Sequence, residues 1–308
     1  MSGEGPDQNT MMRCASCGIG AGDEIKLKKC ACNLVRYCGV KCQRDHRPQH
    51  KRACKKRVAE LRDEILFKQP ESSHFGDCPI CYVPLRADGT KSSMMVCCSK
   101  ILCIGCDYAN TKCELEGRSN PCCAFCRLPR AKTQAEADRY VLKRVEANDP
   151  VALCYMGNSR RMVGDLKGTF EYLSKAAELG DVTAHFNLSD LYQLGHGVAK
   201  DKTKQLHHLE VAAIGGHASA RHNLAAFEWN NGRREGAVKH LIIAAKLGFD
   251  PSLELLKQHY EMGGVSKEDF ASALRAHHAA VNATVTPQRK AAEEGLQQME
   301  AISAALQN

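Results

Sequence analysis

Cysteine is the residue most able to do chemistry in this chain. Eighteen of the 308 residues are cysteine, and seventeen of them lie between Cys14 and Cys126. The first residues lack the basic and then apolar segments of a signal peptide, so we expect the protein in the cytoplasm or nucleus, where thiols stay reduced. A dense block of reduced cysteines favours metal binding over disulfide bonds. Because thiolate and imidazole are preferred ligands of zinc, the sequence predicts Zn²⁺ as the cofactor.

The first cysteine block offers its ligands as closely spaced pairs. A short loop that supplies two ligands at once reduces the entropy cost of assembling a metal site. Two of the pairs have a spacing of four residues, which places both ligands on one face of a helix. Eight ligands are enough for two closed tetrahedral sites. The pairs are Cys14 with Cys17, Cys30 with Cys32, Cys38 with Cys42, and His50 with Cys54.

Residues 37–54, YCGVKCQRDHRPQHKRAC, resemble the second half of a MYND-type zinc finger, with Arg47 where that family commonly has tryptophan. The resemblance implies a finger over residues 13–54 in which two zinc sites interleave. It also implies a protein-binding role, since MYND fingers often bind short proline-containing peptides. The implied ligand sets are Cys14, Cys17, Cys38 and Cys42 for one zinc, and Cys30, Cys32, His50 and Cys54 for the other.

A segment without cysteine separates the two cysteine blocks. Within residues 55–69, Val58, Leu61, Ile65 and Leu66 recur at helical spacing with charged residues between them. This pattern predicts an amphipathic helix that ends at Pro70. We therefore expect residues 55–76 to form a helical spacer between two fingers.

The second cysteine block contains three Cys-x2-Cys pairs and resembles a RING-type finger over residues 77–130. The resemblance implies two interleaved zinc sites, and Lys100 stands where RING fingers usually carry a histidine ligand. A protonated lysine cannot bind zinc, so one site needs another thiol. Cys97, Cys113 and Cys122 are the alternatives, and Cys97 is favoured because it is nearest in sequence. The implied sets are Cys78, Cys81, Cys103 and Cys106 for one zinc, and Cys98, Cys123 and Cys126, completed by Cys97, for the other.

A RING finger holds a ubiquitin-conjugating enzyme in a reactive pose and uses no side chain of its own in bond making. The resemblance places that contact on a hydrophobic residue between the first two cysteines and on a basic residue after the last. Ile80 and Arg127 occupy these positions. The alternative is that Ile80 only packs the finger and Arg127 only begins a linker.

The remainder of the chain repeats itself. Segments that begin at Ala176, Ala212 and Ala244 align at offsets of 36 and then 32 residues. Periods of this size indicate a stack of helical hairpins, because one hairpin cannot bury its apolar face without a neighbour. The four-residue difference falls in residues 195–201, GHGVAKD, which we place between the two helices of that repeat. The positions predicted in the core are Phe170, Leu206 and Val238, with Leu173, Leu209 and Leu241; the predicted helix C-caps are Gly180, Gly216 and Gly248.

One repeat is similar to the Sel-like repeats, which are relatives of tetratricopeptide repeats. The matching residues are Ala184, Leu188, Tyr192, Gly195, Gly197, Val198, Asp201, Ala212, Ala213 and Gly216. The resemblance implies a curved scaffold that binds other proteins. We expect this solenoid over residues 131–285, capped by a less regular fourth unit at residues 251–281. Residues 286–308 form either a last helix or a mobile tail.

Other classes of function have weaker support. Residues 1–57 hold thirteen basic and five acidic residues, which is the whole net charge of +8 and suggests nucleic acid. Thiolate ligands reduce the charge of this finger to about +5, and few aromatic residues are available to stack on bases. Cys154, the one cysteine outside the fingers, is expected to be a buried core thiol rather than a nucleophile. No apolar run approaches the ~18 residues of a membrane span.

The sequence therefore predicts a mainly α protein, with two small zinc-stabilised fingers followed by an α-solenoid. The predicted function is a zinc-binding adaptor whose MYND finger and repeats bind protein partners. The alternative function is a RING-type ubiquitin ligase, which would need no catalytic side chain. We expect between three and four zinc ions per chain.

Overall fold

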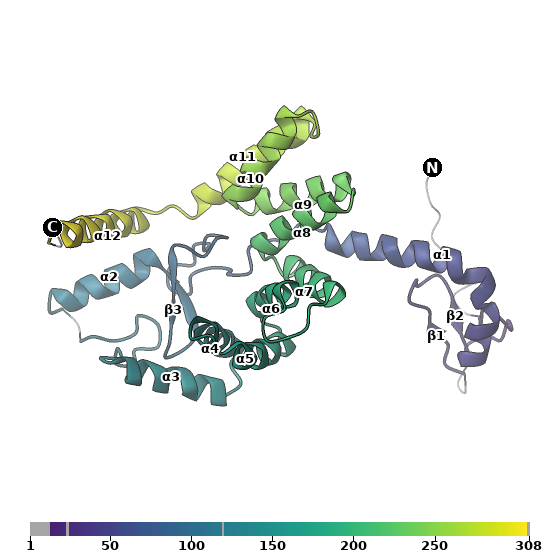
Figure 1. The fold of residues 1–308 in the computed structure, drawn as a ribbon, viewed down its shortest axis with the longest axis horizontal. Helices are drawn as coiled ribbons and strands as arrows, with labels where there is room; N and C mark the ends of the chain where they lie inside the picture. The colour runs from purple at the N-terminus through teal and green to yellow at the C-terminus, as the bar shows by residue number, and fades with distance from the viewer. Residues whose placement is uncertain (1–12, 23–24, 119, 307–308) are drawn as a thin grey trace. The chain divides into compact units, whose positions relative to one another are not determined.

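The computed structural model describes residues 13–22, 25–118 and 120–306, with side chains as far as residue 299. The predicted disordered lead-in, residues 1–12, lies outside this part of the chain. Two compact units, Met1–Lys68 and Gln69–Asn308, are described separately. In the described residues every helix is too short or too polar to span a membrane. Helices dominate, which confirms the predicted mainly α fold (Figure 1).

The first unit contains a two-stranded sheet and one long helix (Figure 1). Strands β1 (Lys28–Lys29) and β2 (Arg36–Tyr37) pair antiparallel, so residues 30–35 form the turn between them. Helix α1 (Val40–Leu66) follows β2 and contains Pro48, whose missing N–H removes one helical hydrogen bond. The helix expected over residues 55–69 is thus the second half of α1.

The second half of α1 is more exposed than an amphipathic spacer would be. Only Leu66 is buried along the helix, whereas Val58 and Ile65 are 38% and 58% exposed. The metal-binding positions of α1 all lie between Cys42 and Cys54, and the helical residues that follow are exposed or half-buried except Leu66.

The second unit begins with the second finger, residues 77–130. Strands β3 (Ser92–Met95) and β4 (Lys100–Cys103) form an antiparallel hairpin, in which Met95 pairs with Lys100. Helix α2 (Ile104–Leu115) follows directly, and the Cys103 sulfur caps it by accepting the N–H of Cys106. Leu85 and Leu102 are buried among the cysteines and form a small apolar core.

A solenoid of helical hairpins follows the second finger (Figure 1). Each helix packs against its hairpin partner, and each of the first three hairpins packs against the next one. Helix α3 (Gln134–Glu146) precedes the stack. The hairpins are α4 (Pro150–Met162) with α5 (Leu166–Glu178), α6 (Val182–Leu194) with α7 (Lys202–Ile214), α8 (Ala218–Asn230) with α9 (Arg234–Lys246), and α10 (Asp250–Glu261) with α11 (Lys267–Ala283).

The turns of the solenoid agree with the repeat alignment. Gly180, Gly216 and Gly248 have φ angles of 89°, 87° and 84°, the left-handed conformation predicted for helix C-caps. Residues 195–201 connect α6 to α7, whereas the corresponding loops 163–165 and 231–233 have only three residues. The four-residue difference between repeat periods is therefore a longer loop inside one hairpin.

The solenoid core is built mainly from leucine and alanine. Leu173, Leu209 and Leu241 are at most 2% exposed. The other predicted core positions, Phe170, Leu206 and Val238, are only half-buried. They lie one turn earlier on the same helices, toward the edge of the packed face, so the core is narrower than predicted.

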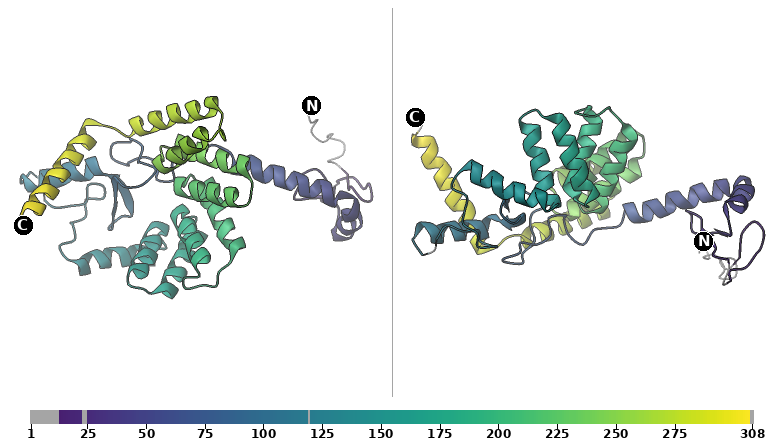
Figure 2. Two further views of the ribbon diagram at one scale, coloured as in Figure 1. Left: turned by 45° about the horizontal axis from the view of Figure 1, so that its top comes forward. Right: turned by 90° about the horizontal axis from the view of Figure 1, so that it is seen from below.

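Two further features of the second unit are the position of Cys154 and the conformation of the C-terminal segment. Cys154 is a buried thiol that packs in the core with Leu153 and Leu173. Burial raises its pKa, so the thiol stays neutral, as predicted for a core cysteine. The C-terminal segment forms a helix, α12 (Pro287–Leu306). Both views in Figure 2 show α12 beside α2 of the second finger, and the two helices are in contact.

Candidate metal centres

The first centre, in the first unit, is formed by Cys14, Cys17, Cys38 and Cys42. Cys14 begins a tight turn that the Gly18 N–H closes by donating to the Cys14 carbonyl at 2.9 Å, with a φ of 73° at Gly18. Cys38 directly follows β2, and Cys42 lies in the first turn of α1. The Cys38 sulfur lies 3.6 Å from the Cys17 sulfur and 3.5 Å from the Cys42 sulfur. Strand, turn and helix thus bring four thiols to one point.

The second centre is formed by Cys30, Cys32, His50 and Cys54. The two cysteines occupy the β1–β2 turn, and the other two ligands lie one turn apart on α1. The Cys30 and Cys54 sulfurs are 3.5 Å apart, and the Cys32 sulfur lies 3.1 Å from His50 Nε2. Burial lowers the pKa of His50, and the neighbouring His46 lowers it further. The neutral imidazole that binds a metal is therefore favoured.

His46 supports the second centre without joining its ligands. Its Nδ1 lies 3.0 Å from the hydroxyl of buried Tyr37, and its ring stacks on His50 with 5.5 Å between centroids. The His46 side chain is half-buried, and its stacking on His50 supports the orientation of a metal-binding imidazole. The signal in the sequence is its position four residues before His50, on the same helix face.

The third centre, in the second finger, is formed by Cys78, Cys81, Cys103 and Cys106. The Cys81 and Cys103 sulfurs are 3.8 Å apart. Backbone N–H groups of Cys103 and Cys106 donate to the sulfurs of Cys78 and Cys103, at 3.5 and 3.4 Å. Burial opposes ionisation of Cys78, but N–H donors from Cys103, Cys81 and Ile80 lower its pKa to about 7. The backbone thus stabilises the thiolate that a metal would bind.

The fourth centre is formed by Cys97, Cys98, Cys123 and Cys126. The Cys97 and Cys126 sulfurs are 3.4 Å apart, and the Cys98 and Cys123 sulfurs are 3.9 Å apart. Of the alternatives that the sequence leaves open, the structure brings Cys97 to this group, and Cys113 and Cys122 lie outside it. Lys100 points instead toward the ring of Phe125, with 5.8 Å to the centroid.

The donor sets and distances of all four centres fit zinc. Zinc–sulfur bonds of ~2.3 Å in a tetrahedron place the sulfurs about 3.8 Å apart. The close sulfur–sulfur contacts within the four groups measure 3.4 to 3.9 Å, far beyond a disulfide bond. All eighteen cysteines are free thiols. Bound zinc would crosslink the chain and so stabilise these fingers, whose apolar cores are small.

The residues predicted to contact a conjugating enzyme are accessible. Ile80 is 37% exposed in the loop between Cys78 and Cys81. Arg127 is exposed directly after the fourth centre and has a φ of 63°, so it lies in a tight left-handed turn. Phe125 and Leu128 beside it are 41% and 44% exposed.

A groove of about 540 Å³ runs along α1 beside the second centre. Its apolar lining comes from both the turn and the helix. Four exposed cations, spaced three or four residues apart on α1, line it as well. The lining residues are Cys30, Ala31, Tyr37, Val40, Gln43, Arg44, Arg47, His50, Lys51, Cys54, Lys55 and Val58.

Arg289, in α12, is a site residue that the sequence does not reveal. Its guanidinium contacts the Cys81 sulfur at 3.7 Å, although 208 residues separate the two positions. No local pattern connects a C-terminal arginine to a cysteine pair so far away, so only the folded chain shows the contact.

Comparisons with known proteins find a match for the first finger and likenesses to two repeat proteins. Residues 11–54 match the family model of the MYND finger. A Sel1 repeat protein from Oxalobacter formigenes aligns with 57% of this chain and 73% of its own, at 24% identity and a TM-score of 0.43. The protective antigen c5321 of uropathogenic Escherichia coli, which displays an SLR fold, aligns with 53% of this chain and 36% of its own, at 19% identity and a TM-score of 0.38. None of the curated proteins matches the chain.

Proposed function

We propose that this chain is a zinc-dependent adaptor whose first finger binds a short peptide segment of a partner protein. The observation that carries the proposal is the groove along α1, in the finger that matches the MYND family model. The groove's lining extends along α1 from Val40 to Val58, and the candidate zinc ligands Cys30, His50 and Cys54 lie in its wall. Metal binding therefore also fixes the shape of the binding surface.

The groove favours an acidic peptide with an apolar centre. Ala31, Val40 and Val58 offer contacts for apolar side chains. The exposed cations Arg44, Arg47, Lys51 and Lys55 line the same groove, and none of them forms an ion pair with a described residue. Carboxylates that flank an apolar segment would complement this arrangement.

A nucleic acid fits the groove less well. The second centre has three thiolates and one imidazole, so a bound zinc carries a net charge of −1 at the groove wall. The groove's one aromatic side chain, Tyr37, is only 3% exposed and cannot stack on a base. Positive charge is therefore confined to the rim, while the interior is apolar and weakly anionic.

The test is selection of randomised twelve-residue peptides on the zinc-loaded full chain. We expect enriched peptides with an apolar centre and flanking Asp or Glu. Combining Arg47→Glu with Lys51→Glu should weaken their binding roughly tenfold, because two attractions become repulsions. The matched control combines Lys41→Glu with Arg52→Glu, since these exposed cations of α1 lie outside the groove. The control should bind like the wild type.

Three results would separate the parts of this proposal. Enriched peptides without acidic residues would leave peptide binding intact and contradict the charge selection. Failure to enrich any peptide would contradict the peptide groove. Salt-dependent binding of duplex DNA that both charge-reversed variants weaken equally would identify the basic surface, rather than the groove, as a nucleic-acid site.

The second candidate function, RING-type ubiquitin ligase activity, is favoured by the exposure of Ile80 and Arg127 on the second finger. The test is autoubiquitination of the full chain with a panel of ubiquitin-conjugating enzymes. Ile80→Ala should abolish activity, while Leu115→Ala, a matched change at an exposed leucine of α2, should not. Inactivity of the wild type with the whole panel would leave the second finger a structural module.

A further inference from the structure

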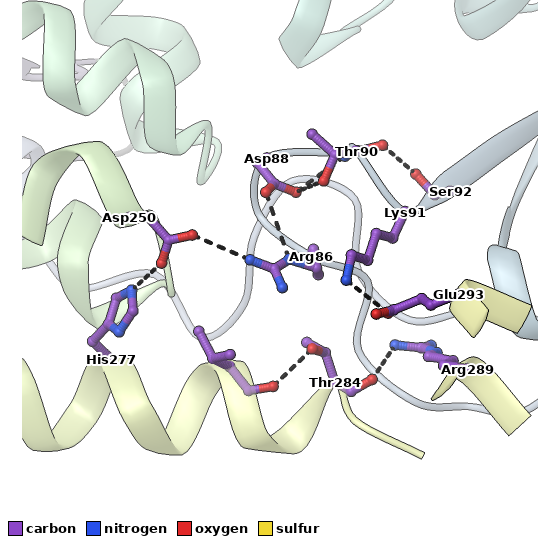
Figure 3. A network of polar contacts seen from close by, with 12 residues as sticks. Arg86, Asp88, Thr90, Lys91, Ser92, Asp250, His277, Thr284, Arg289 and Glu293 are labelled. Atoms are coloured by element: carbon purple, nitrogen blue, oxygen red, sulfur yellow. Dashed lines mark hydrogen bonds and ion pairs between the residues drawn. The ribbon is translucent and has the colours of Figure 1, made fainter. Parts of the chain in front are cut away.

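Helix α12 brings a buried cation to the third centre. Arg289 lies in the first turn of α12 and is only 5% exposed. Its Nη1 donates to the Pro84 carbonyl at 2.7 Å. The same nitrogen donates to the Thr284 carbonyl at 2.8 Å (Figure 3). Its Nη2 donates to the Val83 carbonyl at 3.0 Å and lies 3.7 Å from the Cys81 sulfur. The guanidinium thus binds the loop that follows a metal ligand, and the ligand itself.

The charge of Arg289 requires a counter-ion that the surrounding side chains do not supply. Burying an unpaired cation is costly. Among the described residues no carboxylate forms an ion pair with Arg289, and the nearest acidic residue of α12 in Figure 3, Glu293, pairs with Lys91 at 2.7 Å. A zinc ion with four thiolates carries a net charge of −2. With zinc bound, the third centre would supply the counter-ion for Arg289.

The two helices are shaped for this contact. A Cβ atom at Gly105 of α2 would lie 2.9 Å from Arg289 Cγ and 3.0 Å from its backbone nitrogen. A Cβ atom at Gly295 of α12 would overlap the Tyr108 hydroxyl. Glycine at both positions allows α2 and α12 to approach closely enough for the guanidinium to reach the sulfur.

We infer that Arg289 is a positioning residue for the third metal centre and couples metal binding to the docking of α12. The guanidinium would offset one of the two negative charges of a zinc–thiolate group and lowers the reactivity of the Cys81 sulfur by donating to it. Because coupling between two sites is reciprocal, metal at this centre stabilises α12 on the finger, and docked α12 stabilises the metal.

Site-resolved alkylation tests this inference. The zinc-loaded full chain is treated with N-ethylmaleimide, and peptide mapping gives the labelling rate of each cysteine. Arg289→Met should raise the rate at Cys81 roughly tenfold, the lower end of typical effects of residues that support metal ligands. Arg289→Lys keeps the charge without the planar donor pair and should give a smaller increase. Cys17, in the first unit, is the internal reference and should not change.

Glu293→Gln is the matched control, because it removes the Lys91 ion pair of α12 without touching a sulfur. Equal acceleration of Cys81 labelling in Glu293→Gln and Arg289→Met would show that α12 acts only by covering the finger, and would overturn the inference. A wild-type rate at Cys81 in Arg289→Met would also overturn it. Loss of one zinc from Arg289→Met but not from Glu293→Gln, measured by elemental analysis, would support it at equilibrium.

Discussion

The two fingers use similar ligand spacings but differ in what surrounds the metal. In the first finger the buried residues are Cys14, Cys30, Cys32 and Tyr37, so three of four are themselves ligands. The second finger adds buried Leu85 and Leu102. The first finger would therefore depend mainly on zinc for its stability, whereas the second finger combines zinc with a small apolar core.

The second finger is also held by distant parts of its unit. Arg86 pairs with Asp250 of α10 at 3.2 Å, and Nε2 of His277, in α11, lies 2.9 Å from the same Asp250 carboxylate (Figure 3). His74, just before the finger, donates its backbone N–H to the Gly216 carbonyl at 3.2 Å. Metal loss should therefore affect the two fingers unequally.

The largest expected effect that tests this comparison is removal of zinc by a strong chelator. Structural zinc contributes about 10–16 kcal/mol of folding free energy in small fingers. In the first finger Tyr37 is the one buried described residue that is not itself a ligand. We expect residues 13–54 to lose protection from hydrogen exchange, while α4–α9 keep theirs because their core is leucine and alanine. A first finger that stays protected without metal would contradict the comparison.

Changing one thiol should have a smaller and local effect. Cys97→Ser removes a ligand of the fourth centre, so the zinc content should fall from four ions to three per chain by elemental analysis. Cys113→Ser is the control, because Cys113 lies in the same finger outside the four groups. If Cys113→Ser lowered the zinc content and Cys97→Ser did not, the ligand set of this centre would be wrong.

A cavity in the solenoid should destabilise only the second unit. Leu241 is 1% exposed and packs with Ala245 and Leu256, so Leu241→Ala should cost about 2–5 kcal/mol of unfolding free energy. Chemical denaturation followed by the helical circular-dichroism signal measures the loss. Leu179→Ala, at a residue 46% exposed, should cost under about 0.5 kcal/mol. Zinc content should stay at four ions in both variants.

Acid should weaken the solenoid through its buried histidines. Burial lowers the pKa of His217 to about 2, and the adjacent His74 adds to the shift. The unfolded chain, with a histidine pKa near ~6.5, binds more protons than the folded chain, so stability falls as pH drops below that value. Each such histidine contributes about 1 kcal/mol of loss between pH 8 and pH 6.

The variant His217→Asn isolates this contribution. His217 caps α8 by accepting the Ala220 N–H, and asparagine keeps an N-cap without titrating. The slope of unfolding free energy against pH should become shallower, although His74, whose pKa is lowered to about 4 by burial, still contributes. An unchanged slope would show that His217 does not couple to stability.

Much of the ligand pattern could be predicted because metal spacing is a local property of the sequence. Closely spaced cysteine pairs place ligands together whatever the rest of the fold does, and the four-residue spacing of His50 and Cys54 puts both on one face of α1. The same prediction for Cys38 and Cys42 is wrong, because Cys38 lies before α1 begins at Val40. The repeat periods likewise predicted the hairpins and the longer loop at residues 195–201, because each hairpin must bury its apolar face against a neighbouring hairpin.

The remaining features depend on contacts between distant segments. Helix α1 continues through Pro48, and its metal-site residues Cys42 and His50 lie on either side of that proline. The docking of α12 and the position of Arg289 could not be predicted, because they require the finger and the end of the solenoid to meet. Phe170 is only half-buried because it lies toward the edge of the packed helix face. A repeat alignment does not specify the orientation of each helix relative to the neighbouring hairpin.

The contacts from the second finger to α10 and α12 have a consequence for how the helical array unfolds. A linear array of hairpins opens from its ends, where the terminal unit has a single neighbour. Here the chain leaves the finger into α3 and returns to it through α12, so neither end can peel away while the finger stays bound. Contacts with the finger thus connect the two ends of the array. We therefore expect the array to melt in one cooperative step rather than by progressive fraying from its ends.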